Sequence, residues 1–301
     1  MRTLTRTISE AEAGRTVESV LTNEFALSKS LIRRLKRRET GILLNGARAY
    51  TTARVRAGDV LSAEIGDAAA NAVRPINMPL AIVYEDEDLL VIDKPAGLAV
   101  HPTQDPDEAT LEHALAAYLQ PDEGVHPVSR LDRGTTGLMV VAKNGYMHEL
   151  LRRRLHTDAY FREYRGICVG ELVPRAGQID LPIGFAEGSR YRRAVTPDGA
   201  PSSTGYETLA AWPAPEGTLS LLRLLPHTGR THQLRVHLSA TGHPLLGDWL
   251  YGTEAPERIA RPALHSSVLR FVHPLTGAVI DLSSPLPPDM AALLPAGMAA
   301  P

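Results

Sequence analysis

A single carboxylate placed between two guanidinium groups is the most chemically suggestive feature of this sequence. Asp132 lies between Arg130 and Arg133, in a turn rich in Gly and Thr. The turn leads directly into the apolar stretch 138–142, which has the length and composition of a buried strand. Because Asp is a common turn former that bonds its own backbone, the segment alone permits two interpretations: a structural turn residue or a nucleophile.

The segment 129–137 resembles the Arg-Leu-Asp motif of the RluA-type pseudouridine synthases, in which the Asp is catalytic. Other motifs of that family follow in the family's order, between about Ile76 and Pro287. They are a strand with a Lys-Pro-x-Gly turn at 84–102, the element Arg162-Glu163-Tyr164, a Gly-Arg-x-His-Gln-x-Arg pattern at 228–238, and the segments 242–248, 264–266 and 273–274. Several motifs in one order are more specific than any one of them.

Two positions depart from the family pattern. Ser129 stands where many members have His before the motif, and Thr136 stands where most have Ser. Each position keeps a small polar group, so the departures concern the subfamily and the target site more than the reaction.

The resemblance implies an isomerase that converts uridine in RNA to pseudouridine. This reaction detaches uracil from the sugar and rejoins it through carbon 5, so it requires no redox step, metal or cofactor. It does require an ionised carboxylate near the anomeric carbon, a means of holding the detached base, and a group that manages the proton at carbon 5. The resemblance assigns the carboxylate to Asp132; attack on the sugar, attack on the base and assisted elimination all stay open.

Two further side chains are expected at the same site. Arg235 occupies the family position of the partner of Asp132, and a guanidinium can bind a carboxylate through two hydrogen bonds without losing its charge. Arg230 is a weaker candidate for that contact, and phosphate binding is the alternative for both arginines. Tyr164 occupies the position of an aromatic residue that would stack on the uracil and help with the proton at carbon 5; core packing is the alternative.

RNA contacts are expected from residues that flank these motifs. Arg130 is a candidate for filling the space that a flipped-out base leaves in an RNA helix. The other contacts expected near the site come from Arg133, Arg230 and His232. The partner is therefore RNA, with no membrane involved.

No metal site is predicted. His232 and His237 are five positions apart, which would place them on opposite faces of a strand and suits no standard pair of ligands. Lys94 precedes Pro95 and is expected to form part of a turn, with its ammonium group at the surface.

Residues 14–65 predict a small unit of two helices and a hairpin. Apolar spacing indicates one helix near 17–25 and a second that begins at Ser28 or Ser30 and ends at Gly41, followed by strands at 42–46 and 60–65. The basic residues of the second helix are Lys29, Arg33, Arg34, Lys36, Arg37 and Arg38. The unit resembles the S4-type RNA-binding domain, named after a small-subunit ribosomal protein; a solvated helix face is the alternative.

A stretch of small residues divides the chain. We predict an S4-like domain at 1–66, a linker at 67–77 and a catalytic domain at 78–301. Strands expected at 89–92, 138–142 and 219–225 and helices at 111–119 and 146–155 lack the regular alternation of a doubly wound sheet. The predicted class is α+β, and the resemblance implies the pseudouridine synthase fold, a mixed, largely antiparallel sheet with a central cleft.

Composition sets wider limits. A hydrophobic content of 44% with 22% charged residues is ordinary for a soluble globular protein. The net charge of −2 gives no overall sign of nucleic-acid binding, although binding depends on where the basic residues lie. The single cysteine, Cys168, excludes an internal disulfide and a Cys-x-x-Cys zinc site. Because no stretch resembles a signal peptide or reaches the length of a membrane span, we expect a cytoplasmic monomer.

Two other functions fit parts of the sequence. A glycoside or nucleoside hydrolase would use Asp132 as nucleophile but needs a second carboxylate, for which Glu163 and Asp248 are the nearest candidates. A non-catalytic RNA-binding or ribosome-assembly factor would need only the N-terminal unit, but the joint presence of Asp132, Tyr164 and Arg235 argues against it. Large-subunit ribosomal RNA is the preferred substrate, because the basic N-terminal domain accompanies that target in many relatives, and transfer RNA is the alternative.

Overall fold

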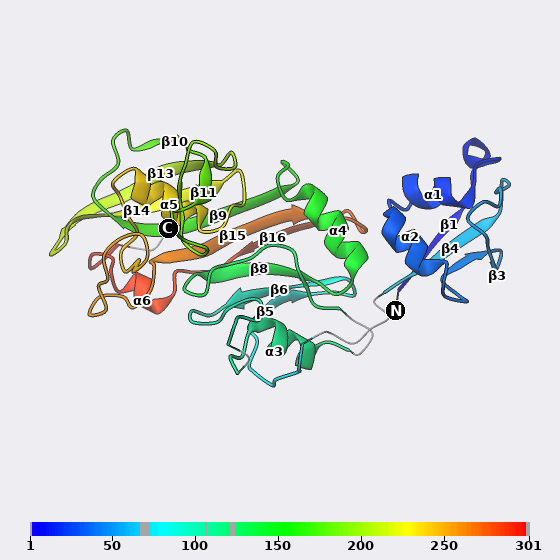
Figure 1. Cartoon of the computed structure of the whole chain (residues 1–301), viewed down its shortest axis with the longest axis horizontal. Coiled ribbons are helices and arrows are strands. Elements are labelled where there is room, and N and C mark those ends of the chain that lie inside the picture. Colours follow the sequence, from blue (N-terminus) through cyan, green and yellow to red (C-terminus); the bar gives the residue numbers. More distant parts are fainter. Residues whose placement is uncertain (1, 67–72, 106, 121–123, 299–301) are drawn as a thin grey trace.

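The computed structural model describes residues 2–66, 73–105, 107–120 and 124–298. In these residues the chain forms a four-stranded sheet near the N-terminus, a ten-stranded sheet and a separate two-stranded hairpin (Figure 1). The predicted α+β class is confirmed. None of the helices in this described part has the length and apolar composition that crossing a membrane requires.

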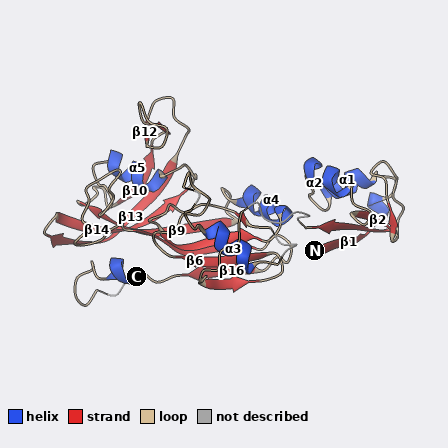
Figure 2. Ribbon diagram, turned by 60° about the horizontal axis from the view of Figure 1, so that its bottom comes forward, coloured by secondary structure: helices blue, strands red, loops and turns tan. Residues whose placement is uncertain are grey.

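The N-terminal sheet has the helices α1 and α2 on one face (Figure 2). Its strands are ordered β1 (Arg2–Thr7), β4 (Val60–Ile65), β2 (Ile42–Leu44) and β3 (Ala47–Arg48), and its helices are η1 (Glu10–Glu12), α1 (Val17–Asn23) and α2 (Lys29–Leu35). The side chains of Thr16 and Ser28 accept hydrogen bonds from the first turns of α1 and α2, and these caps define where the helices begin. The predicted helices and strands of this unit are present, and β1 is an additional strand.

The helix α2 is shorter than the sequence predicts. It ends at Leu35, because the N–H groups of Arg37 and Arg38 bond the carbonyls three residues back and so form turns. Lys36, Arg37 and Arg38 therefore lie beyond the helix and not on its face. The chain then turns at Gly41, where a Cβ would lie 2.2 Å from the carbonyl oxygen of Leu35, so only glycine fits.

The large sheet is mixed and largely antiparallel, as predicted. Its order is β10, β13, β14, β9, β15, β8, β6 and β5, with β16 beside β15 and β7 beside β8. The strands are β5 (Ile82–Glu85), β6 (Leu89–Lys94), β7 (His126–Pro127), β8 (Thr136–Ala142), β9 (Tyr160–Val169), β10 (Ala176–Asp180), β13 (Ser203–Ala214), β14 (Gly217–Pro226), β15 (Leu264–Val272) and β16 (Val279–Ser283). Within the described residues, only β8 and β15 pair in parallel.

Four helices and a hairpin accompany this sheet. The helices are α3 (Leu111–Tyr118), α4 (Gly145–Arg154), α5 (Gln233–Ala240) and α6 (Pro288–Ala291), and the hairpin consists of β11 (Ile183–Phe185) and β12 (Arg193–Val195). The predicted strands near 89–92, 138–142 and 219–225 and helices near 111–119 and 146–155 are confirmed.

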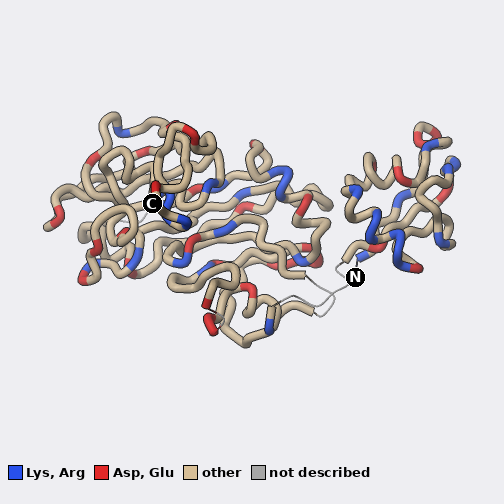
Figure 3. The backbone as a smooth tube through the Cα atoms, viewed as in Figure 1, with Lys and Arg blue, Asp and Glu red and all other residues tan. Residues whose placement is uncertain are grey.

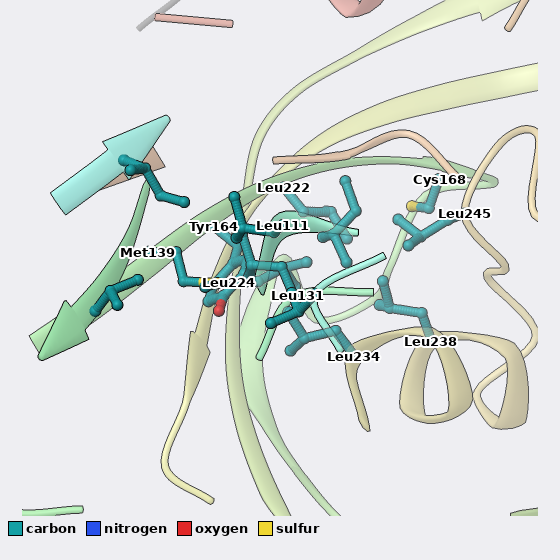
Figure 4. Packing of buried hydrophobic residues seen from close by; sticks show 14 of the residues in the cluster. Leu111, Leu131, Met139, Tyr164, Cys168, Leu222, Leu224, Leu234, Leu238 and Leu245 are labelled. Carbon is teal, nitrogen blue, oxygen red and sulfur yellow. The ribbon is translucent and has the colours of Figure 1, made fainter. Parts of the chain in front are cut away.

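The centre of the large sheet is buried on both faces. Successive side chains of β6 and β8 point to opposite faces, so Leu90 and Met139 join the core beside α3 and α5, whereas Leu89 and Val140 join the core beneath α4. Figure 4 shows the first of these cores, which also contains Tyr164. Burial on both faces explains why these strands are continuous apolar runs without alternation.

The helix α4 also contacts the N-terminal unit. Tyr146 packs in the core of that unit, and its hydroxyl donates a hydrogen bond to the carbonyl of Phe25 at 2.5 Å. Of the predicted linker 67–77, residues 67–72 lie outside the described residues. The division into domains at 1–66 and 78–301 therefore stays a prediction.

Replacing Gly137 by Ala should lower the free energy of unfolding by about 3 kcal/mol or more. Gly137 has a φ of 107°, and an added Cβ would lie 2.2 Å from the carbonyl oxygen of Ser266 on the paired strand. Gly217→Ala is the matched control, since Gly217 has a φ of 108° and open space around it, so its loss is only the backbone strain of about 1–2 kcal/mol. Urea unfolding measures the free energy of unfolding of both variants. Equal losses in Gly137→Ala and Gly217→Ala would contradict the steric explanation.

Candidate active site

Asp132 lies in the loop between β7 and β8, at the start of the central buried strand. Its neighbour Leu131 is buried and anchors the loop in the core, while the Asp132 side chain is 27% exposed. The backbone carbonyl of Asp132 accepts a hydrogen bond from Thr135 N–H at 3.0 Å, which forms the turn that leads into β8. The loop therefore presents a half-buried carboxylate on a rigid base.

Arg235 of α5 binds two carboxylates at once. Its Nη1 donates to Oδ2 of Asp132 at 3.1 Å, while Nε and Nη2 donate to the two oxygens of Asp248 at 2.8 Å each. The side chain of Arg235 is 5% exposed and that of Asp248 fully buried. Burial opposes the charge of Arg235, but the hydrogen bonds and charge of Asp248, together with Asp132, raise the pKa of Arg235 above its ordinary value. Asp248 thus fixes the guanidinium, which keeps Nη1 for Asp132.

The predicted contact between Asp132 and Arg235 is present, and the weaker candidate is not a partner. Arg230 donates from Nε to the carbonyl of Pro201 at 3.2 Å, away from the carboxylate. The catalytic role of the pair stays a prediction.

Tyr164 of β9 lies in the core below this pair. It is 7% exposed and packs in one cluster with Leu131 and Leu224 (Figure 4). Burial raises the pKa of Tyr164 above its ordinary value; the positive charge of Arg162 opposes the shift, and the negative charge of Asp132 adds to it. The phenol is therefore uncharged at neutral pH, and it lies close enough to feel the charge of Asp132.

His232 lies directly before α5 and faces the same carboxylate. Its Nε2 is 3.9 Å from Oδ1 of Asp132, and its Nδ1 is 2.8 Å from the hydroxyl of Tyr251. Burial is the largest cause that lowers the pKa of His232, and the charge of Arg235 acts in the same direction, whereas Asp132 opposes them. The ring is therefore neutral at pH 7.

The predicted strand at 232–237 is wrong, because Gln233 begins a helix here. The Gln233 side chain accepts hydrogen bonds from the Thr228 hydroxyl and from Arg230 N–H and thereby closes the turn before α5. His237 lies within α5, fully buried, with its ring nitrogens bonded to the Thr204 hydroxyl and the Leu181 carbonyl. His237 is a structural residue.

Asp248 and Tyr251 belong to the site, although the sequence suggested neither role. The sequence offered Asp248 only as the second carboxylate of a hydrolase; its ion pair with Arg235 leaves it no freedom to act as a general acid. Glu163, the other candidate, is bound by Arg165 and by Arg223 at 2.6 Å. The only signal for Tyr251 is its position shortly after the 242–248 motif.

Lys94 supports the loop of Asp132 from inside the protein. The prediction of a surface ammonium is wrong: the Lys94 side chain is fully buried. Its Nζ donates to the carbonyls of Pro95, Leu98 and Arg133 at 2.8, 2.9 and 3.2 Å. Burial lowers the pKa of Lys94 to about 8, although the charge of Asp132 opposes the shift. One ammonium group thus ties the 95–98 turn to the residue that follows Asp132.

Replacing Lys94 by Met should cost about 2–3 kcal/mol of unfolding free energy, since three carbonyls lose their donor. We also expect a lower kcat, because the Arg133 carbonyl is released beside Asp132. Lys143→Met is the matched control: Lys143 is a buried lysine after the far end of β8 that pairs with Glu85. It should lose stability without losing kcat. For both variants, urea unfolding measures the free energy of unfolding, and turnover by the folded fraction measures kcat. Equal losses of kcat in Lys94→Met and Lys143→Met would contradict a role for Lys94 at the loop.

The other predicted RNA contacts lie near the Asp132 loop or in the N-terminal unit. Arg130 donates to the Thr231 hydroxyl at 3.3 Å, and Arg133 is bound by Glu108. Of the basic residues at α2, Arg38 is half-buried, with a hydrogen bond to the Gly66 carbonyl; Lys29, Arg33, Arg34, Lys36 and Arg37 are exposed. Figure 3 marks in blue several Lys and Arg positions along the backbone of this unit. Contact of these residues with RNA stays a prediction.

One group of side chains in the described residues has the spacing of metal ligands: Asp86, Asp88 and His273. Nδ1 of His273 accepts hydrogen bonds from the N–H groups of Leu275 and Thr276. Because Nδ1 accepts, Nε2 carries a hydrogen, and this atom faces the carboxylates of Asp86 and Asp88 at 3.3 and 3.9 Å. That hydrogen occupies the position a metal would take, and Asp88 is also paired with Arg2, so the three side chains form a polar cluster.

Comparisons with known proteins identify relatives of this chain. The sequence profile of the family described as RNA pseudouridylate synthase matches residues 88–240. The chain is 35% identical to Uncharacterized RNA pseudouridine synthase YhcT of Bacillus subtilis strain 168, over 94% of this chain and 93% of that protein. It is 36% identical to Ribosomal large subunit pseudouridine synthase D of Escherichia coli O157:H7, over 97% of this chain and 93% of that protein.

The fold is likewise similar to a solved structure. Human RNA Pseudouridylate Synthase Domain Containing 1 aligns with a TM-score of 0.58 and 28% sequence identity, over 73% of this chain and 90% of that one. The chain therefore belongs to the RNA pseudouridylate synthase family and is an isomerase that acts on RNA.

Proposed function

We propose that this enzyme isomerises specific uridines of large-subunit ribosomal RNA and that Asp132 is its catalytic carboxylate. The observation that carries the assignment is the 3.1 Å hydrogen bond from Arg235, whose charge is itself held by Asp248. A guanidinium in that position holds the carboxylate by a charge-assisted hydrogen bond and fixes its orientation, and the reaction needs a carboxylate placed at the sugar. Relatives over nearly the full chain are named for the ribosomal large subunit, which supports the choice of RNA.

In this proposal the other residues hold the RNA and the base. Tyr164 provides an aromatic ring beneath the carboxylate, where stacking of the uracil contributes about 1–3 kcal/mol. This offsets much of the cost of flipping the target nucleotide out of its helix, a few kcal/mol. Arg130 fills the space that the flipped-out base leaves in the RNA helix. Because one chain supplies all of these residues, a monomer is sufficient for catalysis.

The N-terminal unit is proposed to be the S4-like RNA-binding domain. Its support is the run of exposed basic residues on and after α2 in a chain whose net charge is −2. Such a cluster provides a phosphate-binding surface that the overall charge conceals. Action on ribosomal RNA would place the enzyme in the cytoplasm.

Mapping pseudouridines in all RNA from cells that lack this protein tests the proposal. We expect specific sites in large-subunit ribosomal RNA to lose pseudouridine and to regain it when the wild-type chain is restored. Cells that produce the Asp132→Asn variant are the control, and they should resemble cells without the protein. Loss of pseudouridine only from transfer RNA would overturn the ribosomal assignment.

A further inference from the structure

The hydroxyl of Tyr251 connects three parts of the active site. It accepts a hydrogen bond from the backbone N–H of Arg193 at 3.0 Å and is 2.8 Å from Nδ1 of His232. Its ring lies under the guanidinium of Arg235, 5.0 Å from the ring centre, and the backbone N–H of Tyr251 donates to Asp248. The phenol is therefore held by the hairpin strand β12, by α5 and by Asp248.

These contacts determine which nitrogen of His232 carries the proton. The Tyr251 oxygen accepts from Arg193, and donation to Nδ1 of His232 is the arrangement that gives the hydroxyl proton an acceptor among the described residues. Burial raises the pKa of Tyr251 above its ordinary value, so the hydroxyl keeps that proton. In a neutral ring whose Nδ1 accepts, the proton is on Nε2.

The Nε2–H group then faces the catalytic carboxylate. Nε2 is 3.9 Å from Oδ1 of Asp132, the oxygen that Arg235 does not bind. This distance is too long for a hydrogen bond, but contacts of this kind often tighten when substrate closes a site. The groups whose charges act on the ring are Asp132, Arg235, Asp248 and Arg193.

The backbone of His232 has an uncommon conformation. Its φ of 58° and ψ of 20° lie in the left-handed region, which only a few per cent of non-glycine residues adopt, His among the more frequent of them. A conformation of this kind persists only when the surroundings enforce it, and it is concentrated at functional sites. The conformation places the ring between Tyr251 and Asp132.

We propose that Tyr251 is a positioning residue that holds His232 in its Nε2–H form, so that His232 donates a hydrogen bond to Oδ1 of Asp132 when RNA is bound. With Arg235 on Oδ2 and His232 on Oδ1, both oxygens of the carboxylate have a donor and its orientation is fixed for reaction at the nucleotide. This inference rests on the proposed catalytic role of Asp132. His232 acts through that residue and is also a positioning residue.

The Tyr251→Phe variant tests the first part, because it keeps the ring under Arg235 and removes only the hydroxyl. We expect kcat to fall about tenfold, the effect of one lost hydrogen bond, with KM for RNA unchanged. Tyr206→Phe is the matched control: Tyr206 is a partly buried tyrosine on β13 whose hydroxyl donates a hydrogen bond to the Pro174 carbonyl, and the variant should retain wild-type kcat. An unchanged kcat in Tyr251→Phe would overturn the proposal.

Nitrogen-15 NMR of histidine-labelled full-length protein reads the tautomer directly. The His232 signals are identified by their absence from His232→Gln. We expect a protonated Nε2 and an acceptor Nδ1 in the wild type, and a mixture of the two tautomers in Tyr251→Phe. A protonated Nδ1 in the wild type would overturn the proposal. This measurement needs no RNA. It therefore tests the tautomer of His232 even if ribosomal RNA proves not to be the substrate.

Two substitutions of His232 separate its hydrogen bond from its backbone. Asn adopts the left-handed conformation well but its amide is too short to reach Asp132, whereas Gln places an N–H near the position of Nε2. We expect His232→Asn to retain the wild-type Tm and lose at least about tenfold in kcat, and His232→Gln to lose Tm but keep kcat within about threefold. Wild-type kcat in His232→Asn would overturn the role of His232.

Discussion

Replacing Asp132 by Asn should reduce pseudouridine formation by at least about 10³-fold, the scale of loss when an enzyme's reacting carboxylate or nucleophile is removed. Asn has nearly the shape of Asp but no negative charge, so it can neither attack the sugar or base nor assist elimination. The measurement uses RNA with tritium at carbon 5 of uridine, which is released only when carbon 5 forms its new bond to the sugar. Wild type should release the label and Asp132→Asn should not.

The variant should remain folded, which makes the loss of activity interpretable. The Asp132 side chain is 27% exposed, and Arg235 keeps both of its hydrogen bonds to Asp248. The free energy of unfolding should therefore change by less than about 1 kcal/mol. Asp107→Asn is a matched control, because Asp107 is an exposed carboxylate that lines a cavity beside Arg133. Equal tritium release from wild type and Asp132→Asn would rule out Asp132 as the catalytic residue.

Local signals in the sequence predict most of the secondary structure. The residue pair Thr16 and Ser28 caps two helices, and the apolar runs 89–92 and 138–142 are strands because each is buried on both faces. Helix caps depend on neighbours in sequence, and a continuous apolar run is the sequence pattern of a strand buried on both faces, so both can be identified from a single chain. The pairing of Asp132 with Arg235 was predicted through the order of the motifs, because no local pattern joins residues 103 positions apart.

The errors at α5, Lys94 and Tyr251 have one physical cause, which is contact between distant segments. Leu234, Val236 and Leu238 alternate with polar residues and favour a strand, but the segment forms α5 and is buried on every side. Lys94 has the sequence context of a surface turn, and its burial depends on the Arg133 carbonyl, 39 residues away. Tyr251 carries no local signal, since its role depends on Arg193 and on the turn of His232.

Replacing Arg235 by Met should cost about 3–5 kcal/mol of unfolding free energy, the cost of leaving one member of a buried ion pair alone. Asp248 is fully buried and would lose both hydrogen bonds that balance its charge. Tritium release should also fall, because Asp132 loses the donor on Oδ2. Urea unfolding and tritium release under strongly native conditions measure the two effects.

The double variant Arg235→Met with Asp248→Asn separates these effects. It removes the uncompensated charge, so it should be more stable than Arg235→Met alone, and the recovered free energy measures the coupling between the two residues. Its activity should stay low, since the donor to Asp132 is still missing. Recovery of stability without activity would assign Asp248 to holding Arg235 and Arg235 to holding Asp132. An Arg235→Met variant as stable as wild type would contradict the buried ion pair, and full activity in the double variant would remove Arg235 from the reaction.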